Sequence, residues 1–299
     1  MDPTNRPFRS LLYIPGSKTR ALDKAQSLAT DGIIFDLEDA VAVDMKAEAR
    51  SFVANALRDL NYGTRALMVR VNGFETEWAK DDLAEIMEVG PEAILLPKVN
   101  SGTDVKRLES ILDRHPKCQQ TAIWAMMESP MSILNARDIA GASKRMKGMV
   151  LGSNDLIKDL YAKHTQDREA LQTSMGMCLL AARAYGLVCI DGVHNAFRDQ
   201  DGLRISCMQG RNLGFDGKSL LHPDQLDVAN DIYRPSKGEI DLAKRQMTWC
   251  RAEKSAERFN PYKSDIFPEI LGNDLSKNQI MKKSIKKLSE DNFPIYAEC

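Results

Sequence analysis

The sequence predicts a (β/α)8 barrel with a C-terminal helical extension, and three observations support this fold class. Short apolar runs recur eight times within the first 223 residues, with helical patterns between them. Each run is nearly continuous in apolar residues, which is typical of strands buried on both faces of a parallel sheet. The chain contains no GxGxxG motif, which favours a closed barrel over an open doubly wound sheet.

The eight expected strands are spaced so that a helix fits between each strand and the next. In chain order the strands cover 10–16, 32–39, 66–72, 93–99, 122–128, 149–155, 187–195 and 217–223. Apolar residues at helical spacing predict helices at 21–29, 45–60, 82–88, 104–114, 133–140 and 201–213. Ser101 and Ser129 precede two of these helices, and serine is a favoured N-cap residue.

The pattern changes after about residue 235. We expect there one long polar helix over 234–259, a proline-containing connector and a lysine-rich helix over 279–289. We therefore predict a barrel domain over residues 1–235 and a helical extension over 236–299. The extension is expected to fold over the barrel or over a neighbouring subunit.

The composition excludes several classes of protein. A formal net charge of -1 with 28% charged residues argues against a nucleic-acid-binding protein. Six cysteines are scattered without a CxxC pair, which predicts reduced thiols rather than disulfides or a zinc site. The N-terminus lacks an apolar signal core, and no run approaches the ~20 apolar residues of a membrane span. We therefore expect a cytoplasmic protein that does not cross a membrane.

Polar and ionisable residues collect where the expected strands end. In (β/α)8 barrels the active site lies at the C-terminal ends of the strands, so these residues should meet at one mouth. They are Asp36, Glu38, Asp39, Arg70, Asn72, Lys98, Glu128, Asn154, Asp155, His194, Asn195 and His222. A barrel with a purely structural role would not carry ionisable groups at nearly every strand end, so the pattern indicates an enzyme.

Five carboxylates at one mouth would repel one another unless a positive group lies among them. Carboxylates are hard oxygen ligands that suit Mg²⁺ or Mn²⁺ rather than zinc. Mg²⁺ usually takes one or two direct carboxylates, so two of the acids should bind it while the others hold its waters or pair with Arg70 and Lys98. The alternative, in which the acids only cap helices and form ion pairs, stays open at this point. Composition and spacing thus favour a metal-assisted enzyme with an anionic substrate.

The motifs themselves resemble a known family. RSLLYIPGSKTRALDKA, IIFDLEDAV, VRVNG, LLPKV, MMESP, LGSNDL, IDGVHNAFRD and GFDGKSLLHPDQ occur in this order. Over roughly residues 9–235 the chain is similar to the citrate lyase β-subunit-like family of the HpcH/HpaI aldolase superfamily, which includes malyl-CoA and citramalyl-CoA lyases. The resemblance implies a homotrimer or hexamer with Mg²⁺ that cleaves a 3-hydroxyacyl-CoA, such as malyl-, citramalyl- or citryl-CoA. The products would be acetyl-CoA (or a homologue) and a 2-oxo acid, and the reverse condensation is equally implied.

The resemblance also implies roles for individual residues. Glu128 of MMESP and Asp155 of GSNDL are implied as the metal ligands, and Arg70 of VRVN as the cation that holds the substrate oxygens. Asp36, Glu38 and Asp39 would then orient metal-bound waters and hold Arg70 or Lys98, with Glu38 nearest those waters. The residues implied in binding coenzyme A or substrate are Tyr13, Arg20, Lys24, and the backbone at Leu221 and His222.

The C-terminal segment departs from the family pattern. Relatives carry a glycine followed four residues later by an aspartate, which reaches a neighbouring subunit's site as the acid/base group. Here that position after Gly272 is Ser276, and Asp274 lies two residues earlier as a candidate replacement. Two alternatives therefore stay open: an aldolase acting on free 2-oxo acids without coenzyme A, and a non-catalytic ligand-binding subunit of a lyase complex.

Overall fold

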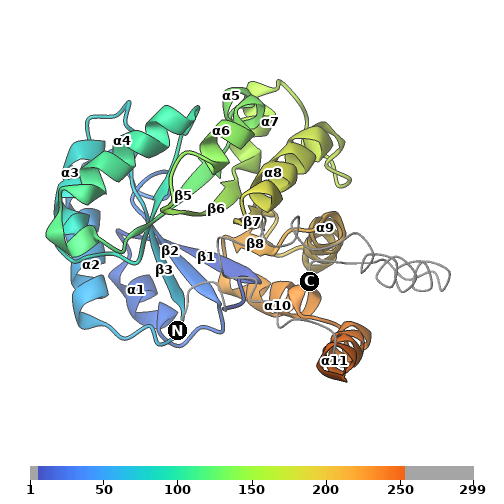
Figure 1. Cartoon of the computed structure of the whole chain (residues 1–299). Helices are drawn as coiled ribbons and strands as arrows, with labels where there is room; N and C mark the ends of the chain where they lie inside the picture. The colour runs from blue at the N-terminus through green and yellow to red at the C-terminus, as the bar shows by residue number, and fades with distance from the viewer. Residues whose placement is uncertain (1–5, 253–299) are drawn as a thin grey trace, which may run out of the picture. The chain divides into compact units, whose positions relative to one another are not determined.

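The computed structural model describes residues 6–252, and its centre is a closed barrel of eight parallel strands in the order β1 to β8 (Figure 1). The strands are β1 (Ser10–Pro15), β2 (Gly32–Asp36), β3 (Ala66–Arg70), β4 (Ala93–Leu96), β5 (Ala122–Met127), β6 (Met146–Leu151), β7 (Val188–Asp191) and β8 (Gly217–Leu220). β8 pairs with β1 from Ser10 opposite Lys218 to Leu12 opposite Leu220, which closes the ring. The predicted (β/α)8 class is confirmed.

Helices follow the strands and cover the outside of the barrel (Figure 1). They are α1 (Thr19–Ala25), α2 (Lys46–Asp59), α3 (Ala79–Met87), α4 (Gly102–Asp113), α5 (Pro130–Leu134), α6 (Ala136–Ala140), α7 (Ser153–Asp159), α8 (Gln172–Ala184), α9 (Gln200–Leu213) and α10 (Leu226–Tyr233). Both predicted N-caps form capping boxes: Ser129 with Ser132 at α5, and Ser101 with Asp104 at α4. These boxes satisfy backbone N–H groups that the first turn leaves without partners.

Two predicted elements differ from the structure, and α8 has no predicted counterpart. The single helix expected over 133–140 is two short helices, because the backbone at Asn135 leaves the helical region with ψ 14°. The strand expected over 149–155 ends at Leu151, so Asp155 lies in the first turn of α7 rather than on a strand. Helix α8 was not singled out; its Leu180 is 75% exposed, and an apolar residue on the solvent face weakens the amphipathic pattern.

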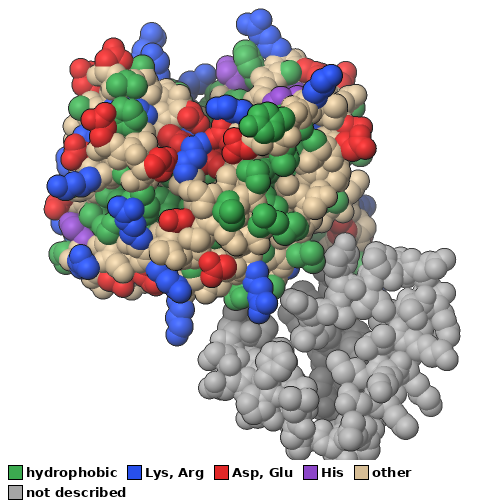
Figure 2. Space-filling view, turned by 90° about the horizontal axis from the view of Figure 1, so that it is seen from above, with side chains coloured by type: hydrophobic (Ala, Val, Ile, Leu, Met, Phe, Trp, Pro, Cys, Tyr) green, Lys and Arg blue, Asp and Glu red, His purple; other side chains and the backbone are tan. Residues whose placement is uncertain are grey.

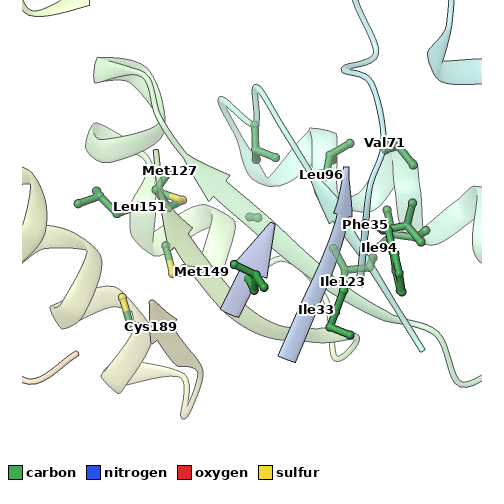
Figure 3. Close-up of a cluster of buried hydrophobic side chains, with 14 of the residues drawn as sticks. Ile33, Phe35, Val71, Ile94, Leu96, Ile123, Met127, Met149, Leu151 and Cys189 are labelled. Carbon is green, nitrogen blue, oxygen red and sulfur yellow. The ribbon is translucent and has the colours of Figure 1, made fainter. Parts of the chain in front are cut away.

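The barrel wall separates two apolar clusters because successive side chains of a strand point to opposite faces. The outer cluster packs between strands and helices and includes Ile33 and Phe35 of β2 with Met149 of β6 (Figure 3). The inner cluster fills the barrel and includes Leu11, Tyr13, Ile34, Ala66, Met68, Leu95, Trp124, Met126, Val150 and Ile190. The core therefore lies on both sides of the sheet, as nearly continuous apolar runs require.

The chain divides into two compact units, residues 1–234 and 235–299. In the second unit the structure describes α11 (Lys237–Ala252), within the long polar helix expected there. The expected connector and the helix over 279–289 lie outside the described residues. Over residues 6–252, no helix combines the length and the apolar character that crossing a bilayer requires. On the face shown in Figure 2, acidic and basic side chains are interspersed rather than separated by sign.

Candidate active site

The two-residue period of the strands brings charged side chains into the mouth of the barrel. On β2 and β3, Ile34 and Met68 face the interior, so Asp36 and Arg70, two residues further on, face the same side. On β5 the interior residues Trp124 and Met126 are followed at the same spacing by Glu128. All three charged residues are buried and stand at the C-terminal ends of their strands. This is the end at which barrel enzymes bind substrate.

Arg70 is the central cation of the mouth. Its Nε and Nη2 donate to the two carboxylate oxygens of Asp36 at 2.7 and 2.6 Å, a bidentate pair. Its Nη1 lies 3.0 Å from Glu38 Oε2 and 3.4 Å from Asp39 Oδ2, and its guanidinium stacks 4.8 Å from the Tyr13 ring centroid. Burial alone would lower the pKa of Arg70, but Asp36 and the neighbouring groups raise it, so the guanidinium stays charged.

The acid turn, residues 36–41, connects β2 to the mouth. Asp36 accepts hydrogen bonds from the backbone N–H of Glu38 and Ala40 at 2.9 and 3.1 Å in addition to those from Arg70. Asp36 therefore serves Arg70 and its own turn. Glu38 is different: its side chain is 10% exposed, and its Oε2 is close to Arg70 but has no partner in hydrogen-bonding geometry.

Lys98 brings two further carboxylates together. It follows β4 in a left-handed conformation (φ 53°), which is uncommon for a residue other than glycine and is typical of functional sites. Its backbone N–H donates to Glu128 Oε1 at 2.7 Å, while its ammonium contacts Asp155 and lies 3.4 Å from Glu128. The same ammonium is 4.0 Å from Glu38. One positive group thus stands among three carboxylates from β2, β5 and α7.

Burial and mutual charge shift the pKa values of these groups. Burial, with the charges of Glu128 and Asp39, raises the pKa of Glu38 to about 8 against the opposing effects of Arg70 and Lys98. The pKa of Glu128 is also raised, mainly by burial. Burial opposes the charge of Lys98, but the nearby carboxylates outweigh it and raise its pKa. Clusters of buried, coupled ionisable groups in a cleft are typical of active sites.

The donor set fits a hard divalent cation with few protein ligands. Within residues 6–252 there is no cluster of three or more His, Cys, Asp or Glu side chains arranged to hold a metal. Glu128 and Asp155 instead offer two carboxylates that already converge on a single positive group, Lys98. Mg²⁺ is commonly bound by one or two carboxylates, with waters and substrate oxygens completing its octahedron. The predicted pair is therefore brought together, and its donor chemistry suits magnesium.

The residues predicted to bind coenzyme A or substrate fall into separate groups. Arg20 and Lys24 are exposed on α1, one turn apart, whereas Tyr13 lies buried beneath Arg70 with its hydroxyl 3.5 Å from Met126 Sδ. The backbone N–H groups of Leu221 and His222 both donate to Gln225 Oε1, at 2.9 and 3.1 Å. Asp274 lies outside the described residues.

Sequence reasoning missed Lys46, which is 6% exposed and donates to three oxygens directly behind the acid turn. A lysine at the start of an amphipathic helix normally faces solvent, so no sequence pattern indicates that this one is buried. Asn72 was noted at a strand end without a role, and it accepts one of these hydrogen bonds.

Known proteins are similar to this chain in sequence and in fold. The HpcH/HpaI aldolase/citrate lyase family matches residues 9–223. A (3S)-malyl-CoA thioesterase of Cereibacter sphaeroides is 53% identical over 252 residues, 84% of this chain and 85% of that protein. Citrate lyase subunit beta of Leuconostoc mesenteroides subsp. cremoris is 35% identical over 240 residues, 79% of this chain and 80% of that protein.

Among solved structures, CitE from Mycobacterium tuberculosis in complex with magnesium, acetoacetate and coenzyme A is similar with a TM-score of 0.68 and 30% identity. The similarity covers 86% of this chain and 92% of that chain. The resemblance inferred from the ordered motifs is confirmed, because the family match spans well over half of the sequence. The chain belongs to the HpcH/HpaI aldolase/citrate lyase family.

Proposed function

We propose that this protein is a magnesium-dependent enzyme that acts on a 3-hydroxyacyl-CoA thioester of the malyl-CoA type and hydrolyses the thioester bond. The observation that carries the proposal is the mouth of the barrel, where Glu128 and Asp155 converge on one cation beside Arg70. The relative at 53% identity is named for (3S)-malyl-CoA, and a similar structure holds magnesium together with coenzyme A. These names support the substrate class and the cofactor.

Glu128 and Asp155 are the residues that would hold the Mg²⁺ ion, for which Mn²⁺ is the alternative. When bound, the ion supplies Lewis-acid polarisation of substrate oxygens and a template for the hydroxyl and carboxylate of the acyl group. Lys98 contacts both carboxylates, so its positive charge lies where the ion would be held. Asp36 and Asp39 hold Arg70, so neither needs to touch the metal.

Arg70 and Glu38 carry the steps that the protein itself performs. Nε and Nη2 of Arg70 are committed to Asp36, whereas Nη1 points toward Glu38 and Asp39 and is the nitrogen placed to stabilise the negative charge that develops on the thioester oxygen. Glu38 takes the proton from the attacking water as the new C–O bond forms, and passes it to the sulfur of coenzyme A as the C–S bond breaks. In the metal-free protein burial raises the pKa of this carboxyl to about 8, and a carboxyl whose pKa is raised toward neutral pH suits a group that both accepts and releases this proton.

The coenzyme A moiety is assigned to the residues around β1. Arg20 and Lys24 lie one turn apart and exposed on α1, which begins just beyond the C-terminal end of β1. Two cations at this spacing can face one phosphate-bearing ligand. Tyr13, Leu221 and His222 stay predicted substrate contacts, and the homotrimer or hexamer stays a prediction as well.

Carbon–carbon cleavage, predicted from the sequence, is the second candidate. It is favoured by the citrate lyase relative and by similar structures that hold oxo acids with magnesium. This route releases an enolate whose carbon must receive a proton. The family position for that donor is Ser276 here, and the candidate Asp274 lies outside the described residues. Hydrolysis needs no such donor, and for this reason we place it first.

One incubation with (3S)-malyl-CoA and Mg²⁺ separates the two reactions by their products. Hydrolysis releases one free thiol and one malate, whereas carbon–carbon cleavage releases acetyl-CoA and glyoxylate without a free thiol. We expect thiol and malate in equal amounts, lost on chelation and in Glu128→Gln. Glu48→Gln, the same change at an exposed position on α2, serves as the matched control and should keep full activity. If neither pair of products forms although the wild type and Glu48→Gln are both folded, an enzymatic role is refuted and the binding subunit is favoured.

A further inference from the structure

The buried ammonium of Lys46 lies directly behind the acid turn. Lys46 is the first residue of α2, and its Nζ donates to Leu37 O at 2.7 Å, Glu38 O at 2.8 Å and Asn72 Oδ1 at 2.8 Å. A lysine ammonium has three donors, so all of them are used. Two of the three acceptors are backbone carbonyls of the acid turn itself. Lys46 therefore binds the turn at the two residues between Asp36 and Asp39.

Asn72, the partner of Lys46 just beyond β3, is itself held in place. Asn72 Nδ2 donates to Leu37 O at 2.9 Å and to Asp82 Oδ2 at 2.6 Å. Asp82 is fully buried on α3 and pairs with Arg50 Nε of α2 at 3.0 Å. The ammonium thus belongs to a network that joins α2, α3 and the end of β3, and it cannot move without breaking several buried hydrogen bonds.

Asp36 and Lys46 hold Glu38 from both sides of its peptide. The N–H of Glu38 donates to Asp36 Oδ1 at 2.9 Å, and its carbonyl accepts from Lys46 Nζ and from the backbone N–H of Val41 at 3.0 Å. The side chain then extends into the mouth, where its Oε2 has no hydrogen-bond partner. This buried oxygen makes an ion pair with Arg70 but no hydrogen bond, so the backbone anchors contribute to keeping the side chain in the mouth.

We propose that Lys46 is a positioning residue: its ammonium fixes the acid turn so that the carboxylate of Glu38 is held between Arg70 and Lys98 in the mouth. The inference rests on the proposed function for the proton transfer that Glu38 performs. It predicts that Lys46 acts on the reaction through Glu38, although Lys46 touches neither substrate nor metal. A residue that only stabilised the fold would affect activity independently of Glu38.

A double-mutant cycle distinguishes these roles. Lys46→Met keeps the length of the side chain but removes its three donors, and should lower kcat at least about tenfold with KM changed less than about threefold. In a Glu38→Gln background the same change should lower kcat less than about twofold, because the group that it positions is already lost. The proposal would be overturned if Lys46→Met lowered kcat by the same factor in the wild-type and Glu38→Gln backgrounds. An unchanged kcat in Lys46→Met alone would also overturn it.

Arg50→Met is the matched control. Arg50 belongs to the same buried network through Asp82 but makes no contact with the acid turn among the interactions of the described residues. We expect it to lower the melting temperature and to leave kcat close to that of the wild type in both backgrounds. If Lys46→Met does not fold, Lys46→Gln, whose shorter side chain carries two amide N–H donors instead of three ammonium donors, goes through the same cycle with the same criteria.

Magnesium affinity, measured by calorimetry without substrate, separates failure of this inference from failure of the proposed function. Residues that orient ligands from behind typically change metal affinity about 10–100-fold when they are replaced. We expect Lys46→Met and Glu38→Gln each to weaken Mg²⁺ binding at least about tenfold, and the double variant to weaken it no further. A wild type that cleaves no thioester but shows this pattern would refute the function and support Lys46. If the losses of Mg²⁺ affinity from the two single variants add in the double variant, the role of Lys46 is refuted, whether or not the wild type cleaves the thioester.

Discussion

Replacing Asp36 tests whether this residue holds Arg70 in place or binds the metal. Its carboxylate is 1% exposed and accepts four hydrogen bonds, two from Arg70 and two from backbone N–H groups of the acid turn. Asp36→Asn keeps the size but removes the charge, and its new NH2 group faces donors. Removing one partner of a buried ion pair costs about 3–5 kcal/mol. Because Glu38 and Asp39 still lie near Arg70, we expect the lower end of this range, a decrease of about 3 kcal/mol in the free energy of unfolding.

The assay is urea unfolding of magnesium-free protein, with the melting temperature as a second measurement. A loss of this size should lower the melting temperature by roughly 6–12 °C for a domain of this length. Asp113→Asn is the matched control: Asp113 pairs with Arg145 at 2.6 Å but is 55% exposed, so we expect a change below about 1 kcal/mol. The reasoning would be refuted if Asp36→Asn cost no more than Asp113→Asn. A large loss of Mg²⁺ affinity without loss of stability would instead identify Asp36 as a metal ligand.

Three further predictions concern the mouth and the coenzyme. Glu128→Gln and Asp155→Asn should each weaken Mg²⁺ binding more than about 100-fold in calorimetry, and retained affinity would refute their assignment as ligands. The pKa of Glu38 is about 8 in the folded protein against an ordinary 4.5, so the folded state binds this proton more tightly and stability should fall as pH rises between these values. Glu38→Gln should remove that fall in urea unfolding of magnesium-free protein, and an unchanged pH profile would contradict the shift. Arg20→Ala and Lys24→Ala should each raise KM for the thioester about three- to tenfold with kcat and melting temperature unchanged, whereas unchanged KM would exclude them from coenzyme A binding.

The barrel could be predicted because its strands carry a strong signal. Strands covered on both faces need apolar residues at nearly every position, and eight such runs leave few other folds. Helix boundaries were less predictable, since capping geometry decides them. The division at Asn135 and the exposed Leu180 of α8 both depend on neighbours that a single sequence does not reveal.

The location of the charged site could also be predicted, but its pairings could not. The strand ends gave the residues of the mouth, and the two-residue period explains why Asp36, Arg70 and Glu128 share one side. The apolar run over 149–151 predicts a strand but does not mark where it ends, and the expected strand extends through Ser153 and Asn154 to Asp155, whereas the structure places Asp155 on α7. The contact of Lys98 with Asp155 depends on a left-handed backbone at Lys98, which sequence alone does not predict.

The density of acids in the acid turn has a cause other than metal binding. Three carboxylates within four residues would repel one another, yet each has its own environment here. Asp36 is neutralised by the bidentate contact of Arg70, Asp39 is 67% exposed to solvent, and the peptide between them is anchored by Lys46. Glu38 extends into the mouth, where its Oε2 lies 3.0 Å from Arg70 Nη1 without hydrogen-bonding geometry.

This division of roles also explains the different cations around the turn. Arg70 must meet two oxygens of one carboxylate in a plane and still present a donor to the mouth, which a guanidinium does and an ammonium does not. Lys46 must reach three acceptors around a point, which is the geometry of an ammonium. Exchanging the two residue types would therefore keep the charge of the site and lose its geometry. The arrangement around Glu38 depends on hydrogen-bond direction as well as on electrostatic balance.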